Sequence, residues 1–179
     1  MIDIETRGKE ILEWLNTEYS GIRTGQATPA LLDNIKVESY GSMMPLNQVG
    51  SVGVEDARTL RVSLWDVGGI PAVETALREA DLGVSVATDS AGLRVIFPEL
   101  TSDRRVQLIK LAKSKLEEGR VSVRSARDEI MKDLDKQQKD GDISEDDKFT
   151  QRESIQAKVD TVNTQLENLY MKKENEVSQ

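Results

Sequence analysis

Residues 102–141 decide the fold class of this chain, and their sequence is SDRRVQLIKLAKSKLEEGRVSVRSARDEIMKDLDKQQKDG. Apolar or small side chains recur there in alternating steps of three and four residues, and they form an apolar seam at Ile109, Ala112, Leu116, Gly119, Val123, Ala126 and Ile130. Thr101, Ser102 and Asp103 are candidate N-caps. Gly141 suits a left-handed residue after the last turn. The stretch predicts one helix about 55–60 Å long whose apolar seam must pack against another element.

Two further segments have helical periodicity. An N-terminal helix of about 22 residues is indicated by apolar residues spaced by three, four and seven, at Ile4, Ile11, Leu12, Leu15, Tyr19 and Ile22. A third helix begins at the capping-box-like Ser144-Glu145-Asp146-Asp147 and continues through Ile155, Val159, Val162, Leu166 and Leu169. Because the connection at 140–142 is short, the last two helices should be antiparallel neighbours, and we predict an antiparallel three-helix bundle.

The interval from Ala30 to Leu100 has the period of two that is typical of strands. Alternation is clear around Ile35 and Val37, around Leu60, Val62 and Leu64, and around Leu93, Val95 and Phe97, with weaker signals at Val52–Val54 and Val84–Val86. Gly69-Ile70-Pro71 starts one short helix with proline in its first turn. The fold class is therefore α+β. Residues 1–29 and 102–179 are predicted to form the bundle, and residues 30–101 a small inserted α+β domain rich in β-strands with one short helix.

Two chain crossings join the predicted domains, and both contain proline. The candidate hinge residues in these crossings are Gly25, Thr28, Pro29, Pro98 and Thr101. Glycine or proline at a helix end also serves simply as a cap or a stop, so the hinge is a hypothesis.

Composition excludes several kinds of chemistry. The 179 residues include no Cys and no His, which removes thiolate nucleophiles, zinc sites of the usual kind and imidazole bases. No phosphate-binding loop or dinucleotide fingerprint is present. The acidic cluster at 140–147 departs from calcium-loop spacing and is better explained by helix capping. We therefore expect no catalytic residue, no metal and no cofactor, and a protein that is not an enzyme.

Neither a signal segment nor a membrane span is evident in the sequence. Residues 1–5 are acidic and lack an apolar core, and no apolar run approaches the roughly 18 residues that a spanning helix needs. We predict a cytoplasmic protein without membrane contact.

Charge is unevenly distributed along the chain, whose formal net charge is −8. The segments before and after residues 102–127 are both acidic. Residues 102–127 carry an excess of basic groups, made of Arg104, Arg105, Lys110, Lys113, Lys115, Arg120, Arg124 and Arg127 against Asp103, Glu117 and Glu118. This segment could bind a polyanion locally, although a solvated helix face is the simpler explanation on charge alone.

Several short motifs resemble the ribosome recycling factor family in order and spacing. They are Ile22-Arg23-Thr24-Gly25, Pro29-Ala30-Leu31-Leu32-Asp33, Tyr40-Gly41, Pro45-Leu46, residues 54–60, Pro71-Ala72-Val73-Glu74, Asp81-Leu82-Gly83, residues 120–124 and Ile143-Ser144-Glu145-Asp146-Asp147. The resemblance covers nearly the full length. It implies an L-shaped molecule, and a translation factor that binds the ribosome after peptide release and, with elongation factor G and GTP, separates the subunits for reuse.

The resemblance also implies ribosomal RNA contacts on the long helix. It places them at Arg120 and Arg124, and arginine forks match phosphate oxygens. The full set of candidate rRNA-binding residues is Arg120, Arg124, Arg127, Lys113, Arg104 and Arg105. Intrahelical ion pairs are the alternative, for instance Glu117 with Arg120 and Arg124 with Asp128. Gln26, where the family usually has a basic residue, and Asp128, where a second arginine often follows Arg127, weaken the local positive charge.

A coiled-coil adaptor or chaperone-like interaction protein is the alternative function. Such a protein would expose its apolar seam and form oligomers, whereas a bundle that buries the seam internally predicts a monomer.

Overall fold

The computed structural model describes residues 3–179. Met1 and Ile2, which begin the predicted bundle segment and the acidic N-terminus, lie outside the described residues. Contacts divide the chain into two units, each discontinuous in sequence. The first contains the chain up to Tyr19 and Ile109–Asn175, and the second contains Ser20–Leu108 and Glu176–Gln179. Helices and an antiparallel sheet are both present, which confirms the α+β class. The domain boundaries at 29/30 and 101/102 stay a prediction.

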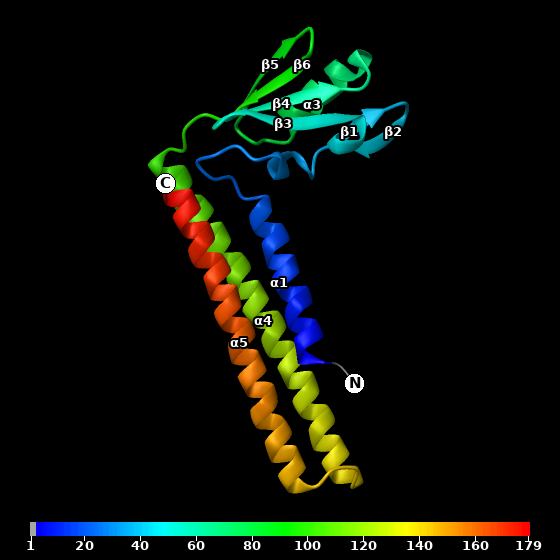
Figure 1. Cartoon of the computed structure of the whole chain (residues 1–179), viewed down its shortest axis with the longest axis vertical. Helices are drawn as coiled ribbons and strands as arrows, with labels where there is room; N and C mark the ends of the chain where they lie inside the picture. The colour runs from blue at the N-terminus through cyan, green and yellow to red at the C-terminus, as the bar shows by residue number, and fades with distance from the viewer. Residues whose placement is uncertain (1–2) are drawn as a thin grey trace. The chain divides into compact units, whose positions relative to one another are not determined.

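The first unit is made of most of three helices, α1 (Ile4–Ser20), α4 (Ser102–Asp140) and α5 (Glu145–Ser178), whose remaining residues belong to the second unit. Figure 1 shows α4 and α5 running antiparallel, with α1 beside them. The predicted length of the first helix was wrong, since α1 has 17 residues and ends just before Gly21. Glycine costs about 1 kcal/mol relative to alanine within a helix, so it ends the helix although the apolar spacing continues to Ile22.

The apolar seam of α4 is buried against the other two helices. Leu116 on α4, Leu166 on α5 and Leu15 on α1 are all almost completely buried. At Gly119 a Cβ would make ordinary van der Waals contacts, 3.6 Å from Leu166 and 3.7 Å from Ile11, so this seam residue lies between all three helices. The three-helix packing follows from the seam, as predicted.

The connection between α4 and α5 is fixed by hydrogen bonds at both helix ends. Asp142 N donates to Gln137 O (2.9 Å) and Gly141 N donates to Gln138 O (3.2 Å), with Gly141 at φ +82°, which is a Schellman C-cap. At the start of α5, Ser144 Oγ accepts from Asp147 N (3.1 Å) and donates to the Asp147 carboxylate (2.6 Å). Both predicted caps are therefore confirmed.

Removing the second cap should have a modest effect on stability. We expect Ser144→Ala to lower the free energy of unfolding by about 1 kcal/mol, because Asp147 N loses its acceptor. Urea denaturation followed by circular dichroism at 222 nm measures this change. Ser154→Ala, at an exposed position in the middle of α5, is the control. Equal effects of the two substitutions would contradict the assignment of Ser144 as a cap.

A four-stranded antiparallel sheet forms the centre of the second unit, in the order β3-β4-β6-β5. The strands are β3 (Gly50–Asp56), β4 (Thr59–Leu64), β5 (Ser85–Asp89) and β6 (Gly92–Ile96). Helix α3 (Ile70–Glu79) has Pro71 in its first turn. All of these elements agree with the sequence prediction.

A second, two-stranded sheet contains one strand that the sequence did not indicate. Strand β1 (Lys36–Ser39) pairs with β2 (Ser42–Pro45), and the one-turn helix α2 (Leu46–Val49) follows. The hairpin turns at Tyr40 (φ +50°) and Gly41 (φ +79°), a pair of positive φ values that suits a tight two-residue turn. Residues 42–45 have the sequence SMMP, which has no alternation and ends in proline, so no strand pattern was visible.

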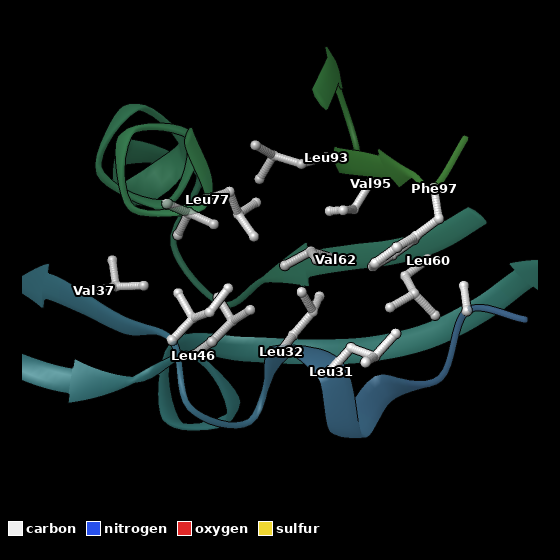
Figure 2. Packing of buried hydrophobic residues seen from close by; sticks show 13 residues of the cluster. Leu31, Leu32, Val37, Leu46, Leu60, Val62, Leu77, Leu93, Val95 and Phe97 are labelled. Carbon is white, nitrogen blue, oxygen red and sulfur yellow. The ribbon is translucent and has the colours of Figure 1, made fainter. Parts of the chain in front are cut away.

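The inner faces of these strands pack on α3 around one aliphatic core. Figure 2 shows Leu60 and Val62 from β4 and Leu93 and Val95 from β6 pointing into it, together with Leu77 from α3. Each of the five is at most 1% exposed. The short 3₁₀ helix η1 (Pro29–Leu32) closes one side of the core with Leu31 and Leu32. This core holds the sheet in place, and with it the residues on the sheet surface.

Candidate nucleic-acid interface

The predicted rRNA contacts in the first unit lie along one stripe of α4. Lys113, Arg120, Arg124 and Arg127 are separated by seven, four and three residues, which places them within one helix face beside the apolar seam. From Lys113 to Arg127 the stripe is about 21 Å long. Side chains on this stripe start from a rigid helix, and their ion pairs decide which of them can receive a phosphate.

Arg120 is already neutralised by carboxylates of its own unit. One guanidinium nitrogen, Nη1, binds Glu117 at 2.7 Å, and Nη2 makes a close ion pair with Glu167 of α5. The predicted pair between Glu117 and Arg120 is thus confirmed. Because the side chain is also half-buried, Arg120 connects α4 to α5 and has little charge available for a polyanion.

Arg127 takes the carboxylate that was expected to pair with Arg124. Its Nε and Nη2 both donate to Asp128 Oδ1, at 3.1 and 2.8 Å. The predicted pair between Arg124 and Asp128 is therefore wrong: both arginines can reach Asp128 along the helix, and the adjacent one binds it. The Asp128 carboxylate therefore offsets part of the attraction that Arg127 could offer to a polyanion.

Arg124 and Lys113 are the exposed members of the stripe. Within residues 3–179, neither side chain has an ion pair or a hydrogen-bond partner. Lys110 is likewise exposed and unpaired in the described part of the chain, and it lies one helical turn before Lys113. Lys110 was not among the predicted contacts, although its spacing of three from Lys113 could have indicated it. We name Lys110, Lys113 and Arg124 the α4 cation row.

Lys115 belongs to the same basic segment but faces another way. Its ammonium group binds Glu18 of α1 at 3.2 Å and Glu118 at 3.1 Å, and it lies 5.8 Å from the centre of the Trp14 ring. The hydrogen bonds to Glu118 and Glu18 raise the pKa of Lys115. This lysine therefore connects α1 to α4 and is not a free cation.

The other two predicted contacts, Arg104 and Arg105, belong to the second unit. Arg105 donates to the main-chain oxygens of Ser178 (2.6 Å) and Gln179 (3.3 Å) and thus fastens the C-terminus. Arg104 is exposed and donates to the neutral Gln107 amide at 3.2 Å. The nearby carboxylate of Glu99 binds Arg58 at 2.9 Å. The charge of Arg104 is therefore not offset by a carboxylate among the described residues, whereas Arg105 holds the C-terminal main chain.

Three of the five candidate hinge residues lie at helix starts. Thr28 precedes η1, Pro29 is its first residue, and Thr101 Oγ1 accepts from Arg104 N at 3.2 Å at the start of α4. Next to Gly25, Ala27 N donates to Ala57 O at 2.8 Å, and beside Pro98, Phe97 N donates to Arg58 O at 2.7 Å. These two backbone bonds hold the chain to the β3–β4 turn on either side. The hinge role stays a prediction.

Comparison with known proteins decides the family. The model of the family described as "Ribosome recycling factor" matches residues 15–177. The chain belongs to the ribosome recycling factor family. Curated members of the family include the ribosome-recycling factor of Chlorobaculum parvum, 42% identical over 174 residues (97% of this chain and 94% of the relative), and that of Rhodospirillum centenum, 43% identical over 175 residues (98% and 95%).

Solved structures of the family have the same fold. A solution structure of the ribosome recycling factor is 33% identical and superposes with a TM-score of 0.77, covering 99% of both chains. A second structure, 37% identical with a TM-score of 0.66, covers 97% of this chain and 94% of its own. It is described as a model of the Thermus thermophilus ribosome recycling factor and the Escherichia coli elongation factor G bound to the E. coli post-termination complex. The resemblance found in the sequence motifs is confirmed.

Membrane insertion has no support in the helices of this family member. Among residues 3–179, none of the helices is both long and apolar enough to cross a bilayer.

Proposed function

We propose that this chain binds the post-termination ribosome and, with elongation factor G and GTP, splits it into subunits for reuse. Membership of the ribosome recycling factor family supports this function, as does the relative described in complex with elongation factor G and the post-termination ribosome. GTP hydrolysis belongs to elongation factor G in this proposal. The chain itself binds the ribosome and acts mechanically, without catalysis, as a monomer in the cytoplasm.

The proposed contact with ribosomal RNA rests on the α4 cation row. Lys110, Lys113 and Arg124, which have no partner among residues 3–179, lie on one face of a rigid helix in a protein whose net charge is −8. An acidic protein approaches RNA favourably only where a local excess of positive charge faces the phosphates, because surface potentials decay within about 8–10 Å in physiological salt. Arg124 is the central contact, since its fork can donate two hydrogen bonds to one phosphate.

The burial of the apolar seam supports this function over the adaptor alternative. Leu116, Val123 and Leu134 on α4 are each at most 2% exposed, so the seam packs inside the chain and offers little to a partner helix. An adaptor would expose the seam.

Subunit splitting is the experiment that tests the proposed function. Purified post-termination ribosomes are mixed with this chain, elongation factor G and GTP, and light scattering follows the loss of intact ribosomes. We expect scattering to fall only when all three components are present. Unchanged scattering in the complete mixture, with a known ribosome recycling factor active under the same conditions, would contradict the proposal.

Rigidifying the first crossing tests the hinge. We expect Gly25→Pro to retain ribosome binding but to lose most of the splitting activity, because proline fixes φ near −65° and restricts the preceding residue. Gly25→Ala is the graded control, since no described atom lies closer than 3.6 Å to the added Cβ. Pelleting measures binding and light scattering measures splitting. Full splitting by the proline variant would remove Gly25 from the hinge.

A further inference from the structure

The second unit contains a groove that the ribosomal RNA contacts do not use. Its volume is about 360 Å³, and it lies between the β1–β2 hairpin, the end of β4 and the start of α3. Tyr40 and Trp65 both line it and are 90% and 71% exposed. Two large aromatic side chains exposed together around a concave surface are typical of a binding site.

Hydrogen bonds hold a carboxylate beside the two aromatic rings. Asp66 Oδ2 accepts from the Tyr40 hydroxyl at 2.7 Å, and Oδ1 accepts from Gly68 N at 2.9 Å. These bonds lower the pKa of Asp66, so the group stays ionised at neutral pH. Each oxygen retains a lone pair for a further donor. The carboxylate is thus oriented, charged and next to an exposed indole ring.

The charges of the groove all have one sign. Of the described residues that line it, the charged ones are Glu38 and Asp66, and neither has an ion pair. On the sheet surface of this unit, by contrast, Glu55 is paired with Arg94 at 2.6 Å and Asp89 with Arg61 at 2.6 Å. The groove therefore lacks the countercharge that the sheet surface has.

We propose that this groove docks a basic side chain, above all an arginine, from a polypeptide partner. A guanidinium group can stack on Trp65 while it donates to Asp66, and this combination of an aromatic face with a carboxylate is specific for a planar cation. Apolar residues of the lining favour a polypeptide over a small cation. Met44 from β2 and Val49 from α2 line the groove, and a peptide backbone with apolar neighbours would cover them.

The peptide acetyl-Ala-Arg-Ala-amide is the probe, and the Trp65 indole resonance of the full-length, nitrogen-15-labelled protein is the readout. We expect the resonance to shift on titration. The citrulline counterpart of the peptide, which keeps the shape and loses the charge, should bind about fivefold more weakly or worse. Shifts that are the same for both peptides would overturn the proposal in favour of an apolar ligand. Shifts that depend on protein concentration without peptide would overturn it in favour of a second copy of the chain.

Asp66→Asn separates the charge from the fold of the groove. Asparagine keeps the acceptor for Gly68 N and the size of the side chain, so the unliganded resonance should stay in place while affinity for the arginine peptide falls about fivefold. Glu79→Gln removes the same charge from an exposed position of α3 outside the groove and should leave affinity unchanged. Equal affinities for the two variants would contradict a role for Asp66. Because the readout needs no ribosome, its failure is distinguishable from failure of the recycling function.

Discussion

Gly92→Ala should lower the free energy of unfolding of the second unit by about 3 kcal/mol or more. Gly92 begins β6 at φ +139°, a conformation that alanine adopts only with strain, and an added Cβ would lie 2.1 Å from Val62 O. That oxygen belongs to the central strand β4, whose side chains fill the core shown in Figure 2. The clash cannot be relieved by a side-chain rotation. Either the turn between β5 and β6 or the pairing of β6 with β4 must open.

The two tryptophans of the chain allow this effect to be located. Trp65 lies in the second unit and Trp14 in the bundle. In a Trp14→Phe background, the tryptophan fluorescence of Gly92→Ala during urea unfolding therefore reports on the second unit alone. Gly53→Ala on β3 is the matched control, because no described atom lies within 4 Å of its added Cβ and its backbone is extended. We expect the control to change stability by less than about 1 kcal/mol. A Gly92→Ala variant as stable as this control would contradict the sheet register.

Arg124→Ala should weaken ribosome binding by about 1–3 kcal/mol without changing the helix content. The side chain is exposed and unpaired within the described residues, so its removal breaks no internal contact. Lys110→Ala and Lys113→Ala should have smaller effects, because a lysine is a point charge that cannot donate in parallel to one phosphate. Pelleting at fixed salt measures the dissociation constant of each variant.

Arg7→Ala is the control for loss of charge alone. Arg7 is an exposed arginine on α1 whose Nη1 binds Glu10 at 3.2 Å, and it lies off the α4 cation row. Its removal should change ribosome affinity by less than about 0.5 kcal/mol. If Arg7→Ala weakened binding as much as Arg124→Ala, the interaction would depend on net charge and not on the row.

Helical periodicity gave the bundle correctly, because a seam such as Leu116 and Val123 can be buried only by neighbouring helices. The same spacing did not locate the end of α1, where Gly21 outweighs the apolar pattern that continues to Ile22. Strand β2 was missed because SMMP has no alternation and ends in proline, although it pairs with β1 through a two-residue turn. Alternation, by contrast, identified both strands at the centre of the core.

Charge counting found the basic segment but not its free members. Asp128 is within reach of two arginines, and helix spacing alone cannot decide that it binds Arg127 and leaves Arg124 without a partner among the described residues. Arg120 similarly depends on Glu167, which is far away in sequence. The groove at Trp65 could not be predicted from the sequence for the same reason, since its walls come from a hairpin, a strand end and a helix. The sequence shows residue types directly, whereas ion pairs and grooves depend on residues that only the fold brings together.

The salt dependence of ribosome binding tests the central claim most directly. Pelleting of the wild-type chain, Arg124→Ala and Arg7→Ala over a series of salt concentrations gives the slope of log affinity against log salt. We expect a clear negative slope for the wild type, a slope smaller in magnitude by about one for Arg124→Ala, and the wild-type slope for Arg7→Ala. A wild-type affinity that does not depend on salt, or an Arg124→Ala slope equal to that of the wild type, would contradict docking of α4 on ribosomal RNA.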